Sequence, residues 1–138
     1  NNVRKFLVEM GGYFTFVGNQ YRIEIEDNEF FIDLLLYHRI LRCLVAIELK
    51  IGAFKPEYAG KMQFYLTALD EKSKLKDENP SIGIILCKSK NRTIVEYALR
   101  NIKKPVGVAT YRITDKLPKE YQKYLPSPEE ISEKLKWM

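Results

Sequence analysis

Residues 13–25 are predicted to form a strand, because apolar and polar positions alternate in the motif YRIEIE, and residues 29–37 are predicted to form a second one. Alternation with a period of two is typical of β-strands that bury one face. Asp27-Asn28 between the two segments is a turn signal, so the second strand is expected to return antiparallel to the first. Residues 42–50 are apolar on both faces, which predicts a third strand in the centre of the sheet.

The pattern changes to a helical period after the third strand. Pro56 suits the first turn of a helix, and apolar residues then recur at helical spacing, so a helix is predicted over residues 56–74. Tyr58 and Tyr65 on this helix are expected to lie in the core rather than to stack on bases. The apolar segment SIGIILC, residues 81–87, predicts a short, buried, parallel strand.

Thr93 and Glu96 form a capping box, which predicts a second helix over residues 94–102. Its inner face is expected to carry Val95, Ala98, Leu99 and Ile102. Residues 3–10 also have helical spacing, and residues 106–113 have the pattern of a last strand. The order of helix, three-strand meander, helix, strand, helix and strand predicts an α/β fold with a central mixed sheet flanked by helices.

A chain of 138 residues that is 46% hydrophobic and 30% charged is long enough for one globular domain. No apolar run approaches the ~20 residues of a membrane helix, so a cytoplasmic protein without a membrane partner is expected. The chain begins in mid-pattern without a methionine, which suggests a fragment of a longer protein, truncated at its N-terminus. We expect a domain over residues 1–115 and a C-terminal surface extension over residues 116–138.

The cysteines and the histidine do not indicate a metal site. Cys43 and Cys87 lie in separate apolar segments and are expected to be buried thiols. His38 is the single histidine and is expected in a turn, so the sequence disfavours a zinc site.

The net charge of +5 is unevenly distributed. Residues 1–60 carry 7 basic and 8 acidic side chains, whereas residues 61–138 carry 16 and 10. A carboxylate-rich half beside a basic half suits an enzyme whose metal site meets a polyanion. A solvated lysine-rich surface would give the same count, so charge alone does not decide between them.

Three charged residues, Asp33, Glu48 and Lys50, interrupt the apolar segment FIDLLLYHRILRCLVAIELK. Strand parity places Glu48 and Lys50 on one face, and closure of the hairpin around residues 38–41 brings Asp33 near the level of Glu48. Two adjacent carboxylates repel unless a cation such as Mg²⁺ binds them. The lysine could then orient water and neutralise a phosphoryl oxygen. An ion pair at a sheet edge is the structural alternative, and the residue types leave the two interpretations even.

Other charged residues near this segment also have two interpretations. Arg22 either flanks the site or pairs across strands, and pairing is slightly favoured. Lys88, Lys90 and Arg92 form a basic cluster at a helix start, where phosphate contacts and a solvated loop are equally expected.

Four segments carry a family resemblance, namely FVGNQYRIEIE, FFIDLLLYHRILRCLVAIELKIG, FKPEYAGKMQFYL and CKSKNRTIVEYAL. They resemble the PD-(D/E)-x-K (PD-(D/E)XK), restriction-endonuclease-like nuclease superfamily, and in particular the bacterial PDDEXK nuclease-domain proteins. The resemblance covers residues 3–115, and its block over residues 31–65 is specific. It implies the αβββαβ core of that superfamily, preceded by an N-terminal region.

The resemblance also implies roles for individual residues. The implied ligands of Mg²⁺ are Asp33, Glu48 and the carbonyl of Leu49. Lys50 would act on the attacking water, and Gln63 would lie beside the active site, with an ordinary surface amide as the alternative. Glu9 is the candidate for the further carboxylate that many members carry on the first helix. Ile32 stands where the motif has a proline, a departure without chemical consequence.

The function implied by the resemblance is a Mg²⁺-dependent nuclease, with Mn²⁺ as a substitute, that hydrolyses phosphodiester bonds in nucleic acid, with DNA favoured. A homodimer would supply the two sites that cleavage of a duplex needs. Two alternatives of another class stay open: a catalytically silent nucleic-acid-binding or assembly module with a nuclease-like fold, and a pure protein-interaction domain. The intact set of two acids and a lysine argues for the enzyme.

Overall fold

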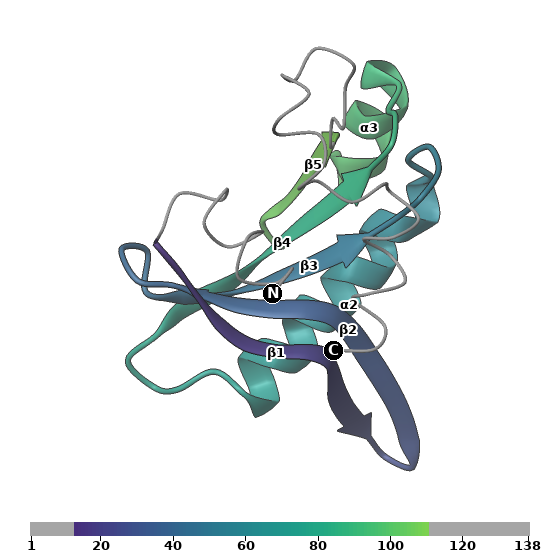
Figure 1. Ribbon diagram of the computed structural model, residues 1–138. Coiled ribbons are helices and arrows are strands. Elements are labelled where there is room, and N and C mark those ends of the chain that lie inside the picture. The colour runs from purple at the N-terminus through teal and green to yellow at the C-terminus, as the bar shows by residue number, and fades with distance from the viewer. Residues whose placement is uncertain (1–12, 111–138) are drawn as a thin grey trace, which may run out of the picture.

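The computed structural model of the protein describes residues 13–110. A five-stranded sheet with the order β1-β2-β3-β4-β5 forms its centre, and α2 crosses one face of the sheet (Figure 1). The elements are β1 (Phe14–Ile25), β2 (Asn28–His38), β3 (Cys43–Leu49), α2 (Pro56–Lys72), β4 (Asn79–Cys87), α3 (Arg92–Leu99) and β5 (Val106–Thr110). The predicted order is confirmed over these residues, whereas the predicted helix over residues 3–10 lies outside them.

The sheet is mixed, as the sequence predicted. β1 pairs with β2 and β2 with β3 in antiparallel fashion, whereas β4 is parallel to both β3 and β5. Because β3 and β4 run in the same direction, Lys50 and Lys88 follow neighbouring strand ends at one edge of the sheet. The segments after these ends also pair, since the N–H of Lys88 donates to the carbonyl of Gly52 at 3.0 Å.

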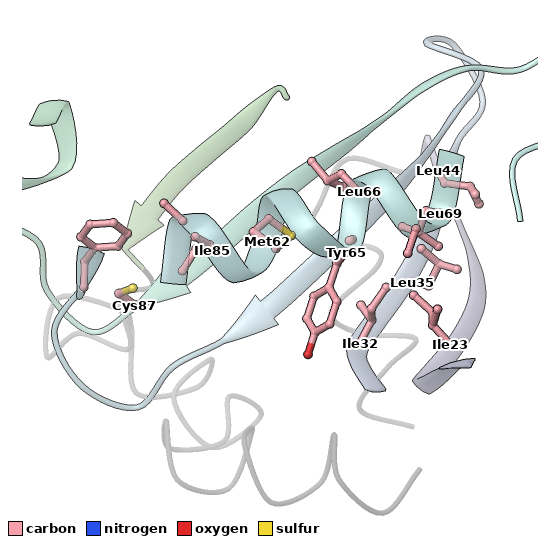
Figure 2. Packing of buried hydrophobic residues seen from close by; sticks show 14 residues of the cluster. Ile23, Ile32, Leu35, Leu44, Met62, Tyr65, Leu66, Leu69, Ile85 and Cys87 are labelled. Carbon is pink, nitrogen blue, oxygen red and sulfur yellow. The ribbon is translucent and has the colours of Figure 1, made fainter. Parts of the chain in front are cut away.

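Apolar side chains cover both faces of the sheet. On the face under α2, Leu44 and Ala46 of β3 and Ile85 of β4 belong to one cluster with Met62 of the helix (Figure 2). The opposite face has its own cluster, which comprises Leu34, Leu36, Cys43, Val45, Ile47 and Leu49. Every residue of β3 is buried, which confirms the predicted central strand. The two cysteines are free and buried, as predicted.

The start of α3 differs from the prediction of a capping box. Asn91, and not Thr93, caps the helix, since its side-chain oxygen accepts a hydrogen bond from the N–H of Ile94 at 3.1 Å. Glu96 is instead paired with Arg92, one turn earlier, at 3.2 Å. The predicted inner face is confirmed, because the side chains that pack against the core include Val95, Ala98, Leu99 and Ile102. Within residues 13–110, no helix is long and apolar enough to cross a membrane.

Gly83 of β4 lets α2 approach the sheet closely. A Cβ atom at this position would lie 2.5 Å from Cγ and 2.7 Å from Sδ of Met62. We expect Gly83→Ala to destabilise the protein by about 1–3 kcal/mol, because overpacking shifts the core. Gly107→Ala on β5 is the matched control, since a Cβ there meets nothing within 4 Å. Urea unfolding compares the variants, and equal midpoints would contradict this account of the packing.

Candidate active site

The strands β2 and β3 separate where Asp33 and Glu48 meet. Leu34↔Ile47 is the last pair of the β2–β3 ladder, so Asp33 and Glu48 would form the next one. Their carboxylates replace the backbone acceptors there, and the N–H of Asp33 donates to Oε2 of Glu48 at 3.0 Å. In the same way, the N–H of Leu49 donates to Oδ2 of Asp33 at 2.9 Å. The structure therefore brings the two acids together across the hairpin.

The strand β2 bends at Asp33, where the alternation of its side chains changes phase. Ile32 and Leu35 lie in the same core cluster beside α2, although strict alternation would place them on opposite faces. Phe31, which directly precedes Ile32, is exposed. The β1–β2 hairpin curves away from the rest of the sheet beyond this region (Figure 1). The bend opens the fork between β2 and β3 that the two carboxylates occupy.

Glu48 is buried, with 5% of its surface exposed. Burial raises the pKa of Glu48 to about 8, and the neighbouring Asp33 carboxylate adds to the rise. The N–H of Asp33 and the charge of Lys50 oppose it. The metal-free pair therefore retains a proton at pH 7. A buried acid with a pKa near neutrality beside a second carboxylate is typical of a functional site.

Lys50 follows β3 and lies against α2. Its backbone N–H donates to the carbonyl of Leu86 at 2.8 Å, which extends the pairing of β3 with β4 by one residue. Its Nζ lies 4.6 Å from the ring centroid of Tyr58 on α2, so the ammonium is placed over an aromatic face. Because the charge of Lys50 also lowers the pKa of Glu48, the acid and the lysine form one electrostatic unit.

Two further residues of α2, Lys61 and Tyr65, lie within electrostatic reach of the carboxylates, and sequence reasoning missed them as site residues. Burial lowers the pKa of Lys61, but Tyr65 and the carboxylates of Glu48 and Asp33 outweigh it, so the pKa is raised. Burial raises the pKa of Tyr65, and the charge of Glu48 raises it further. The Nζ of Lys61 lies 5.7 Å from the Tyr65 ring centroid. No signal in the sequence marked Lys61, because it is an exposed lysine beside the buried Met62 on the helix.

Gln63 is not brought to the carboxylates. Its Oε1 accepts hydrogen bonds from the backbone N–H groups of Lys103 at 2.7 Å and Lys104 at 3.4 Å. On an α-helix, side chains two residues apart point about 160° away from each other, so Gln63 and Lys61 lie on opposite sides of α2. The amide therefore holds the loop before β5, and the position expected beside the acids from the family resemblance carries Lys61 and Tyr65 instead.

Arg22 lies on the β1–β2 hairpin and pairs there. Its guanidinium contacts the carboxylates of Glu24 and Glu29 at 2.9 Å each, and all three side chains are about half exposed. The sequence had favoured such pairing over a role at the site. Glu26 and Asp27 at the turn are also exposed, so the outer surface of the hairpin is acidic.

The predicted basic cluster extends from the carboxyl end of β4 to the start of α3. Lys88, Lys90 and Arg92 are exposed there, and Nζ of Lys90 donates to a carbonyl of β5 at 3.1 Å. Because β3 and β4 are parallel neighbours, this cluster lies at the same edge of the sheet as Lys50. Glu9, the further carboxylate candidate, lies outside the described residues.

The donor set at the fork suits a hard divalent cation. Its side-chain donors are carboxylate oxygens, and no group of three or more His, Cys, Asp or Glu within residues 13–110 is placed to hold a metal ion. Mg²⁺ commonly takes one or two protein carboxylates and keeps several waters, so a two-acid set fits this ion. A bound cation would also relieve the repulsion between the two neighbouring carboxylates.

Comparison with known proteins places the chain in a family. Residues 1–126 match the family model of the YhcG PDDEXK nuclease domain. The chain is similar to the protein named "Putative nuclease YhcG" of Escherichia coli (strain K12), with 39% identity over 135 residues. This match covers 98% of the chain and 33% of the relative, so the chain spans a third of that protein's length.

Two solved structures share the fold. An EndoMS complex with dsDNA2 has a TM-score of 0.56 and 13% identity, over 80% of this chain and 43% of that one. A repair endonuclease from Pyrococcus abyssi has a TM-score of 0.53 and 14% identity, over 80% of this chain and 45% of that one. At such identities the likeness concerns the fold alone, and it confirms the restriction-endonuclease-like α/β architecture.

Proposed function

The chain belongs to the YhcG PDDEXK nuclease domain family, and on this premise we propose that it is a metal-dependent nuclease that cleaves phosphodiester bonds in DNA. The observation that carries the proposal is the pair of Asp33 and Glu48 at the fork of the sheet, with Lys50 beside it. Mg²⁺ is the ion that fits the donor set best, and Mn²⁺ is its natural substitute because it also prefers oxygen ligands.

Asp33, Glu48 and the carbonyl of Leu49 would hold the ion. A divalent cation bound there would neutralise charge on the phosphate and lower the pKa of water. The protein contributes rigidity, because each acid accepts a hydrogen bond from a backbone N–H of the opposite strand. Fixed ligands require little reorganisation when charge develops in the transition state.

Lys50 and Lys61 supply two cations near the acids, one from the end of β3 and one from α2. Lys50 is the group that we assign to the attacking water and to the phosphoryl oxygen on which negative charge develops. Lys61 has a raised pKa and stays protonated, so we assign it an electrostatic contact with the phosphate and not the role of a base. The ring of Tyr65 faces this ammonium, with its centroid 5.7 Å from Nζ of Lys61.

The distribution of charge favours a polyanion that lies over the β4–α3 side. Lys88, Lys90 and Arg92 lie at the same edge of the sheet as Lys50, whereas the acidic outer surface of the hairpin would repel phosphate. One structural relative is described as a complex with dsDNA, which supports DNA as the class of polymer. The homodimer stays a prediction.

Asp33→Asn tests the proposal directly. Asparagine keeps an acceptor for the N–H of Leu49 but removes the charge that would bind the ion, so we expect a loss of cleavage of at least about 100-fold. The assay combines plasmid and single-stranded DNA with the purified domain in Mg²⁺, in Mn²⁺ and in EDTA. Asp27→Asn at the exposed hairpin tip is the matched control and should cleave like the wild type.

Three results would contradict the proposal. Cleavage by Asp33→Asn at the wild-type rate would remove the acid from the mechanism, and cleavage that persists in EDTA would remove the metal. Salt-dependent binding of DNA without cleavage under any divalent ion would support the catalytically silent module instead.

A further inference from the structure

Gln20 contacts Asp33 from the side of the strand opposite to Glu48. Its Nε2 donates to Oδ1 of Asp33 at 3.2 Å, while Oδ2 of the same carboxylate accepts the N–H of Leu49 at 2.9 Å. Because β2 lies between β1 and β3, the carboxylate is held at both oxygens by the two flanking strands. Gln20 lies in FVGNQYRIEIE, a segment that carries part of the family resemblance, but the sequence assigned no role to it.

The backbone of Gln20 is left-handed, with φ at 45°. Residues other than glycine seldom adopt this conformation, because the Cβ atom approaches the following carbonyl oxygen. The β1–β2 register has Cα partners on either side of Gln20 and Asp33 but none for these two residues. The ladder is therefore interrupted at the pair whose side chains are joined by a hydrogen bond.

We propose that Gln20 is a positioning residue for the metal site, which fixes the Asp33 carboxylate for the incoming ion. This inference rests on the proposed function. Glycine would adopt the same backbone without steric strain, so local stability does not explain a glutamine here. What glutamine adds is an amide donor that reaches Oδ1 of Asp33. Hydrogen bonds of this kind to ligating carboxylates orient them and tune the affinity of metal sites.

Two variants separate positioning from a structural role. Gln20→Gly removes both the donor and the strain, whereas Gln20→Met removes the donor but keeps the strain and the approximate length. Binding of Mn²⁺ to the purified protein, measured by calorimetry without nucleic acid, is expected to weaken about 10- to 100-fold in both. The metal-free melting temperature should be equal to or above that of the wild type in Gln20→Gly and below it in Gln20→Met. If the Mn²⁺ affinity fell in Gln20→Met alone, the loss would be explained by the lower stability of that variant, and the proposal would be overturned.

Glu26→Gly is the matched control. Glu26 has a similar left-handed backbone, with φ at 54°, but lies at the exposed hairpin turn, so the variant should keep the Mn²⁺ affinity of the wild type. A wild-type protein that binds Mn²⁺ and cleaves DNA, together with a Gln20→Gly variant of equal affinity, overturns only the role of Gln20. A wild-type protein that neither binds Mn²⁺ nor cleaves overturns the proposed function as well.

Discussion

Glu48→Gln is expected to lower nuclease activity by at least about 1,000-fold, while the fold stays intact. Glutamine keeps an oxygen that accepts the N–H of Asp33, so the link between β2 and β3 survives. It lacks the charge that a divalent cation requires. Cleavage of DNA at saturating Mg²⁺ measures the loss, and Glu57→Gln, an exposed acid in the first turn of α2, is the control. Residual cleavage within tenfold of the wild type would exclude Glu48 as a ligand.

The same substitution is expected to change how stability depends on pH. The Glu48 carboxyl has an ordinary pKa of 4.5 and a pKa of about 8 in the folded, metal-free protein, so the native state binds the proton more tightly. The resulting contribution to stability is complete below pH 4.5 and is lost as the pH rises through about 8. Between about pH 5 and about pH 9, the melting temperature of the metal-free wild type should fall more than that of Glu48→Gln. Parallel curves would contradict the assignment of this pKa.

Lys50→Ala is expected to lower cleavage by about 100-fold or more, because it removes the cation beside the acids. The charge of Lys50 also lowers the pKa of Glu48, so the rate of the variant should reach its plateau at a higher pH than in the wild type. Lys50→Arg should not restore activity, since a guanidinium differs from an ammonium in shape and keeps its proton. Rates are measured as a function of pH at subsaturating Mg²⁺, where the proton on Glu48 competes with the ion.

Lys55→Ala is the matched control for this variant. Lys55 precedes α2, is exposed, and makes no capping hydrogen bond with its side chain. An equal loss in both variants would mean that general basicity, and not the position of Lys50, supports cleavage.

The order and direction of the strands followed from the sequence because each strand carries its own local pattern. Two-sided apolar content placed β3 at the centre, and the long helical connection made β4 its parallel neighbour. The prediction was wrong where two neighbouring residues could play the same role. At the start of α3, Asn91 and Thr93 both have capping side chains, and the loop geometry selected Asn91.

The acids of the site were visible because a charge within an apolar strand needs a partner or an ion. Lys61 was not, because a lysine on a helix is ordinarily solvated, and only the packing of α2 on the sheet brings it near Glu48. Gln63 was assigned by resemblance, and its rotation about the helix axis turned it toward the loop at Lys103. The role of Gln20 could not be predicted, since the residue type does not reveal a left-handed backbone at a glutamine.

The backbone bonds accepted by Asp33 and Glu48 show what kind of residue the sheet itself requires. To satisfy two N–H groups at a fork, any side chain with a suitably placed oxygen suffices, and asparagine and glutamine would do so at every pH. Amides would also avoid the burial of a group that can become charged, which costs free energy. A scaffold selected for shape alone would therefore be better served by amides at these two positions. The acids reduce the stability of the free domain above neutral pH, and a cation bound between them would offset that loss.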